Sequence, residues 1–207
     1  MKKNKGEDTK RLIREAAYKL FLIKGYNTSS LKELERSVHV ARGSLYYHYP
    51  NKQELFIDVI DHYLLRSRMV DYRVTNSNEP LWNFIADYIQ NIQAIIDEMK
   101  QLLFPSTQTD IIRGYIHLVF QAERYYPEFS THINQITLNE IQSWESVLCH
   151  AKEKGEIKSS CNLPLLARLL RNIFFGILYQ DSLACEQNLI EKLREAYHFQ
   201  YRLIREQ

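Results

Sequence analysis

Three segments near the N-terminus carry apolar residues at helical spacing. In residues 8–24 the apolar side chains recur three and four positions apart, which predicts an amphipathic helix. Gly25 follows directly and is expected to end this helix in a left-handed conformation. Ser30, with Glu33 three residues later, has the spacing of a capping box that begins a second, short helix. A third short helix is predicted for residues 42–49, which end before a proline.

The remaining chain continues the helical pattern. Asn51 is an expected N-cap for a fourth helix, which reaches about residue 72 and would bridge two modules. Residues 75–80 (TNSNEP) contain no apolar side chain and predict a linker. Further helices are predicted at residues 81–103, 109–125, 127–154, 164–182 and 187–205. With 45% hydrophobic residues and only 6 Gly and 5 Pro, the chain is predicted to be all-α, with about nine helices.

Charge divides the chain into two parts of opposite sign. Residues 1–52 hold 12 Lys and Arg against 5 Asp and Glu, a net charge of +7, whereas residues 53–207 have a net charge of −5. A basic block is typical of a module that binds a polyanion, although a solvated basic arm has the same composition. Charge alone leaves both interpretations open.

The second and third helices have the length and the short connection of a helix-turn-helix, whose second helix lies in the major groove of DNA. A plain three-helix bundle has the same spacing. The third segment favours DNA because it offers a cation, hydroxyls, phenols and a glycine that permits close backbone approach. Alternatively, Tyr46, Tyr47 and Tyr49 anchor the segment against the first helix, and for Tyr49 this is the favoured interpretation.

These residues resemble the signature of the tetracycline-repressor (TetR) family over about residues 10–60. The resemblance rests on Gly25-Tyr26-Asn27, on Ser30-Leu31-Lys32-Glu33-Leu34, and on the run from Arg42-Gly43-Ser44-Leu45 through Tyr46-Tyr47-His48-Tyr49-Pro50 to Asn51-Lys52-Gln53-Glu54-Leu55. It implies a homodimeric, cytoplasmic regulator, usually a repressor, that leaves its double-stranded operator when a small molecule enters the C-terminal domain. No cofactor is implied.

The resemblance also implies DNA-binding roles for particular residues. They are Ser29 and Ser30 at phosphate, Arg42, Gly43 and Ser44 at base edges, Tyr46, Tyr47 and His48 at backbone and bases, and Lys52 at a phosphate. Three positions depart from the family pattern: Glu35 replaces a common alanine, His39 a turn glycine, and Ala41 a capping serine or threonine. The missing cap is expected to cost about 1 kcal/mol of helix stability.

The last two predicted helices are the expected dimer interface, because residues 164–182 are apolar on nearly every side. The candidate interface residues are Leu166, Leu170, Phe174, Ile177, Leu193 and Tyr197. A four-helix contact across a twofold axis would bury both helices. An ordinary monomeric core is the alternative.

Aromatic residues are dense after residue 80, and some are expected to line a pocket for a bulky, mostly apolar molecule. The candidates are Trp82, Tyr88, Phe104, Tyr115, Phe120, Trp144, Phe175 and Tyr179. The three cysteines and scattered histidines lack the spacing of a metal site, and no catalytic motif is present, so neither metal nor enzyme activity is predicted. The cysteine count fits a reduced cytoplasm, and no segment has the roughly 18 apolar residues of a membrane span.

The sequence therefore predicts a helix-turn-helix DNA-binding domain at residues 1–52 and a helical ligand-binding and dimerisation domain at residues 53–207. The predicted function is a ligand-responsive transcription regulator, a repressor of a palindromic operator. The alternative is an all-helical carrier of a hydrophobic ligand, or an enzyme, that does not bind DNA. A net charge of +7 at the N-terminus favours the regulator.

Overall fold

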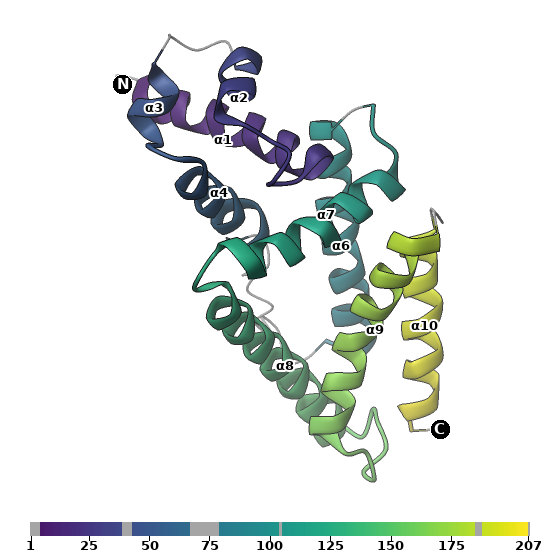
Figure 1. The fold of residues 1–207 in the computed structure, drawn as a ribbon. Helices are drawn as coiled ribbons and strands as arrows, with labels where there is room; N and C mark the ends of the chain where they lie inside the picture. The colour runs from purple at the N-terminus through teal and green to yellow at the C-terminus, as the bar shows by residue number, and fades with distance from the viewer. Residues whose placement is uncertain (1–4, 39–42, 67–78, 104, 185–187, 207) are drawn as a thin grey trace. The chain divides into compact units, whose positions relative to one another are not determined.

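The computed structural model describes residues 5–38, 43–66, 79–103, 105–184 and 188–206 (Figure 1). The secondary structure of these ranges is α1 (Lys5–Lys24), α2 (Leu31–Ser37), α3 (Ser44–His48), α4 (Lys52–Ile60), the π-helical segment η1 (Asp61–Leu65), α6 (Leu81–Leu103), α7 (Gln108–Tyr125), α8 (Phe129–Glu153), α9 (Leu163–Ala184) and α10 (Leu189–Ile204). One isolated bridge joins Ile157 to Arg205. The predicted all-α fold is confirmed. Among the described residues, no helix is long and apolar enough to cross a membrane.

Local capping signals set several helix boundaries. Gly25 has a φ of 81° and its N–H donates to Phe21 O at 2.8 Å, so α1 ends where predicted. Asn51 caps α4, because its side-chain oxygen accepts from the Glu54 N–H at 2.9 Å. Ser30 caps α2 by accepting from the Glu33 N–H at 3.1 Å. Only this half of the expected capping box forms, because the Glu33 carboxylate pairs with Lys24 Nζ instead.

The fourth helix is not uniformly α-helical. Residues of η1 continue α4 with wider π-helical turns, in which the Arg66 N–H donates to Asp61 O, five residues earlier. Short π segments inside α-helices are often found at functional sites. The predicted end of this helix near residue 72 and most of the predicted linker at 75–80 lie outside the described residues.

The chain divides into two compact units. Unit 1 comprises Met1–Val70 and Arg113–Ile133, and unit 2 comprises Asp71–Ile112 and Asn134–Gln207. Helix α7 therefore contributes its first five residues to unit 2 and the remainder to unit 1. The assignment of residues 1–52 to a DNA-binding domain and of residues 53–207 to a ligand-binding and dimerisation domain stays a prediction.

The core of unit 1 forms between α1 and the helices around it. The buried face of α1 carries Ile13, Ala17 and Phe21, and the Phe21 ring meets the Phe56 ring of α4 edge-on at 5.3 Å. Helix α7 approaches α1 closely at Gly114, where an added Cβ would lie 2.6 Å from Leu22 O. A larger residue at this position would push the two helices apart, so the glycine permits their contact.

Unit 2 has an aromatic core formed by α6, α8, α9 and α10. The Trp144 indole stacks on the Tyr197 ring with centroids 5.9 Å apart, and Tyr88 contacts both rings. Two ion pairs tie helices together: Arg171 Nε lies 2.9 Å from Glu140 Oε2, and Lys192 Nζ lies 2.6 Å from the fully buried Asp181. These contacts link α9 to α8 and to α10.

Candidate nucleic-acid interface

Helix α3 presents two tyrosines to solvent while a leucine and a third tyrosine anchor it. Leu45 is fully buried and Tyr49 is 3% exposed, whereas Tyr46 is 48% exposed and Tyr47 is 85% exposed. This division follows from the helical period, because positions 45 and 49 share one face and positions 46 and 47 point away from it. The outer surface of α3 therefore carries two phenol groups.

Gly43 begins α3 in a conformation that favours glycine. Its φ is 85°, and apart from its chain neighbours no atom of the described residues lies within 4 Å of the position that a Cβ would occupy. The residue is exposed, and Ser44 beside it is half-buried. A bare backbone at the start of a helix permits close approach of another molecule. Arg42, the residue predicted to read bases, lies outside the described residues.

A polar cluster beneath α3 fixes its orientation. The Tyr49 hydroxyl donates to the Asp58 carboxylate of α4, and Arg14 Nε of α1 donates to the same Oδ2 at 2.8 Å. Burial raises the pKa of Asp58, but the hydrogen bonds from Tyr49 and Arg14 outweigh it and hold that pKa below the ordinary value. Tyr49 has a strongly raised pKa, because of burial and then the Asp58 contact, so its hydroxyl stays a donor. The prediction that Tyr49 is an anchor is confirmed.

The two serines predicted to meet phosphate are placed differently. Ser30 is exposed at the N-cap of α2. Ser29 is 4% exposed, and its Oγ donates to Gly25 O at 2.6 Å. The Ser29 hydroxyl therefore closes the turn between α1 and α2, and only Ser30 presents its side chain at the surface.

Lys52 is also held inside this turn. Its Nζ donates to Tyr26 O at 2.6 Å and to Ser29 O at 2.8 Å. Sequence reasoning did not single out two other exposed cations, Lys32 and Arg36, on α2. Their spacing of four residues places them on one side of that helix. This spacing could have identified them from the sequence as a pair of neighbouring surface cations.

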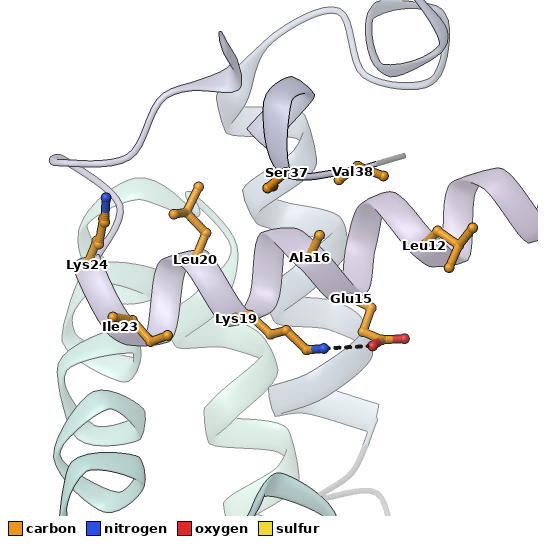
Figure 2. A pocket seen from close by; sticks show the side chains of 9 residues that line it. All are labelled: Leu12, Glu15, Ala16, Lys19, Leu20, Ile23, Lys24, Ser37 and Val38. Carbon is orange, nitrogen blue, oxygen red and sulfur yellow. Dashed lines mark ion pairs between the residues drawn. The ribbon is translucent and has the colours of Figure 1, made fainter. Parts of the chain in front are cut away.

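A surface hollow of about 450 Å³ lies in unit 1, against α1 and the end of α2 (Figure 2). Its lining consists of Leu12, Glu15, Ala16, Lys19, Leu20, Ile23, Lys24, Ser37 and Val38. Lys19 pairs with Glu15 along one side at 3.0 Å. None of the aromatic residues predicted to bind a ligand lines this hollow.

Of the predicted ligand-binding residues that the structure describes, Trp144 and Tyr88 contact each other, and the set as a whole is not brought together. Trp144 and Tyr88 lie in the buried aromatic core of unit 2, where they contact Phe84 and Tyr197; Tyr197 was predicted for the dimer interface. Trp82 faces His198 at 5.5 Å, and Phe175 lies under Arg171 at 4.2 Å. The remaining candidates are separated: Tyr115 and Phe120 belong to unit 1, Tyr179 is 53% exposed, and Phe104 lies outside the described residues.

Four of the six predicted dimer residues are buried inside the chain itself. Leu166, Leu170, Leu193 and Tyr197 pack α9 against α10, and the Tyr197 hydroxyl donates to Leu170 O at 2.9 Å. Phe174 and Ile177 are half-buried. These residues are buried within the chain because a helix that is apolar on every side packs one of its faces against its own chain.

A second set of apolar side chains on these two helices remains exposed. Its large members are Leu165, Leu169, Tyr179 and Leu183 of α9 and Phe199 and Leu203 of α10, each at least 50% exposed. Gly176 lies on the same stripe of α9, and outside its own helix backbone no atom of the described residues comes within 4 Å of its Cβ position. The α9 residues recur at intervals of three, four and seven, which places them on one side of the helix.

Residues 13–59 match the model of the family described as bacterial regulatory proteins, tetR family. The chain is 33% identical over 131 residues to IcaR of Staphylococcus epidermidis, the HTH-type negative transcriptional regulator of the biofilm operon icaADBC. That alignment covers 60% of this chain and 60% of the relative, less than two thirds of its length.

Several solved structures have a similar fold. One is a TetR-family transcriptional regulator from Cytophaga hutchinsonii, 14% identical, with a TM-score of 0.69 and all of both chains covered. Another is SmeT in complex with triclosan, 16% identical, with a TM-score of 0.69 over 96% of this chain and 92% of that one. SmeT is the repressor of a multidrug efflux pump of Stenotrophomonas maltophilia. At these identities the likeness concerns the fold.

Proposed function

Because the chain belongs to the tetR family of bacterial regulatory proteins, we propose that it is a transcription regulator that binds a palindromic DNA duplex as a homodimer. In this proposal it represses transcription and leaves the DNA when a small, mostly apolar molecule binds to unit 2. Helix α3 enters the major groove, and the start of α2 meets the phosphate backbone.

The observation that carries the proposal is the outer surface of α3. Tyr47 is 85% exposed and Tyr46 is 48% exposed, although aromatic side chains of this size are usually covered in part. A phenol donates a hydrogen bond to phosphate oxygen, and its ring packs against sugar and thymine methyl groups. The exposed Gly43 allows the backbone beside them to approach the duplex.

Two copies are needed to read a palindrome. We propose that the exposed apolar stripe of α9 and α10, rather than the buried residues predicted from sequence, covers the same stripe of a second copy. A twofold axis requires a self-complementary surface, and an apolar stripe meets this requirement. The two α3 helices would then lie about 34 to 36 Å apart, one turn of the duplex.

The effector is proposed to bind among the aromatic side chains of unit 2. Support comes from the dense cluster around Trp144 and from the complex of SmeT, of similar fold, with triclosan. Release from DNA requires a coupling of about 1 to 3 kcal/mol between effector and DNA. We propose that α4 and η1 transmit it by changing the separation of the two α3 helices.

The proposal is tested by fluorescence anisotropy with the purified full chain and the duplex from upstream of its own gene, at several salt concentrations. We expect site-specific binding whose logarithmic affinity falls linearly with the logarithm of salt, as charges on phosphates are neutralised. Equal affinity for a scrambled duplex would refute the proposal. A chain that copurifies with an apolar compound and ignores DNA would instead be a carrier.

Arg42 is proposed to read a base edge, most naturally guanine, although it lies outside the described residues. Arg42→Ala is expected to relax sequence preference at one position of each half-site, since a bidentate contact to guanine discriminates by about 1 to 3 kcal/mol. Competition between duplexes that differ at single base pairs measures this preference. An unchanged ranking of the duplexes would exclude the role.

A further inference from the structure

The turn between α1 and α2 is held by a lysine from α4. Lys52 Nζ donates to Tyr26 O at 2.6 Å and to Ser29 O at 2.8 Å. These two carbonyls lie at either end of the turn, and the Ser29 N–H also donates to Tyr26 O at 3.3 Å. Lys52 therefore closes the segment that leads into the first residue of α2.

The Lys52 ammonium, on a half-buried side chain, contacts an aromatic ring as well as the two carbonyls. It lies 4.2 Å from the centroid of the Tyr26 ring, which attracts a cation through its electron-rich face. An ammonium has three N–H donors, and two of them are used by the carbonyls. Burial lowers the pKa of Lys52. A phosphate would have to compete with two backbone acceptors for this charge.

Helix α7 also contacts this turn. The Tyr26 N–H donates to Gln121 Oε1 at 2.6 Å, and the Tyr26 ring contacts the Phe56 and Tyr125 rings at 4.7 and 4.4 Å. A Cβ on Gly25 would come within 2.8 Å of Gln121 Nε2. Because α4 and α7 both contact the turn, its backbone has little freedom to move.

From this geometry we propose that Lys52 is a positioning residue, which fixes the turn that presents the exposed Ser30 to the DNA, and that it does not contact phosphate itself. The proposal concerns the DNA interface of the proposed function and rests on it. Ser30 follows Ser29 directly, so a shift of the Ser29 carbonyl moves the N-cap of α2.

The salt dependence of DNA binding separates positioning from phosphate contact. Each neutralised phosphate contributes about 0.9 to the slope of logarithmic affinity against logarithmic salt. In Lys52→Met we expect DNA binding about tenfold weaker than in the wild-type chain. The slope of logarithmic affinity against logarithmic salt should equal that of a control variant that loses a different lysine. The control, Lys19→Met, removes the same charge from unit 1 at a side chain that pairs with Glu15 on the surface.

A second variant keeps the test decisive if Lys52→Met folds poorly. Lys52→Gln retains two N–H donors without the charge, so it is expected to bind DNA at least threefold more tightly than Lys52→Met. A slope that is less steep by about one unit in both variants, relative to Lys19→Met, would overturn the proposal and assign Lys52 to a phosphate.

Amide hydrogen exchange tests the turn without DNA. In Lys52→Met the Ser29 and Tyr26 amides are expected to exchange about tenfold faster, while amides of α10 in unit 2 keep their rates. Unchanged exchange at both turn amides would contradict the positioning role. If the wild-type chain binds no DNA, the proposed function fails, but this measurement still decides whether Lys52 holds the turn.

Discussion

Two surfaces of the chain leave large side chains in solvent, and their chemistry differs. Helix α3 exposes Tyr46 and Tyr47 beside a bare glycine backbone, whereas α9 and α10 expose mainly leucines, together with a phenylalanine and Tyr179. A phenol can donate to a phosphate oxygen, but a leucine side chain gains only when apolar surface covers it. The first surface therefore suits a polar partner such as a duplex, and the second suits an identical apolar surface.

The two surfaces also differ in how they are supported. Helix α3 has only five residues, and its orientation depends on Tyr49, Asp58 and Arg14 beneath it. Helix α9 has 22 residues and buries a complete apolar face against its own chain. A short reading helix needs a polar cluster to fix its direction, whereas a long helix is fixed by burial along its length.

The largest effect is expected from a charge in the apolar stripe. Leu169→Glu places a carboxylate at a residue that is 50% exposed and, in the proposed dimer, covered by the second copy. We expect a monomer in sedimentation and a loss of DNA affinity on the order of 100-fold, because half-site binding loses the second contact. Leu138→Glu, the same change at a residue 53% exposed on α8, is the control and should stay dimeric. A dimeric Leu169→Glu would place the interface elsewhere.

Removing the charge beneath α3 is expected to have the next largest effect. Asp58→Asn weakens two hydrogen bonds to a carboxylate that is 27% exposed, at a cost of about 2 kcal/mol in the free energy of unfolding. Because the folded pKa of Asp58 lies below its ordinary 3.8, its contribution is complete above that pH and is lost as the pH falls through the folded value. Urea unfolding at pH 7 and pH 3 measures both effects. Because Asp58 begins to be protonated at pH 3, the free energies of unfolding of the variant and the wild type should differ less there than at pH 7.

A matched control for Asp58→Asn is Asp97→Asn on α6. Asp97 is 52% exposed and lies 3.8 Å from Lys100, so its loss should change the unfolding free energy by less than about 0.5 kcal/mol. Equal losses in the two variants would mean that the cluster beneath α3 is no more than a surface ion pair.

Tyr47 can be removed with little effect on the fold, because most of its side chain is exposed. Tyr47→Ala removes a side chain that is 85% exposed, so the melting temperature should hardly change. We expect roughly tenfold weaker binding to the operator duplex, equivalent to about 1.4 kcal/mol. Phe120→Ala, at a ring 64% exposed on α7, should leave DNA affinity unchanged. Wild-type affinity in Tyr47→Ala would show that this phenol is not at the interface.

The smallest effect is expected at the cap of α2. Ser30→Ala removes the acceptor of the Glu33 N–H and should lower the unfolding free energy by about 1 kcal/mol. Ser37→Ala, at the other end of α2, loses only a bond from Oγ to Leu34 O and should cost less. Thermal unfolding of the two variants gives the order of the effects, and a reversed order would count against the capping role.

Helix boundaries could be predicted because their signals are local. Gly25 and Asn51 cap helices where the sequence indicates, and α6 has the predicted bounds. A cap needs only a few neighbouring residues, so its geometry is contained in the sequence around it. The same local reasoning identified Tyr49 as the buried member of three neighbouring tyrosines.

Orientation across the chain could not be predicted in this way. Leu165 and Leu166 are chemically identical, yet the first is 54% exposed and the second 6%, since α10 covers only one side of α9. Tyr115 and Phe120 fall in unit 1 because Gly114 lets α7 approach α1. Lys52 contacts carbonyls 23 and 26 residues away. Such contacts depend on tertiary packing, which no short sequence window contains.

The central claim, that the outer surface of α3 reads a duplex, is tested most directly by selection from a random library of double-stranded DNA. The full chain and a Tyr46→Ala, Tyr47→Ala double variant would be used in parallel. The account predicts that the wild-type chain enriches inverted half-sites centred about 10 base pairs apart, or a multiple of that spacing, and that the double variant enriches them far less. Enrichment of the same motif to the same extent by the double variant would contradict it.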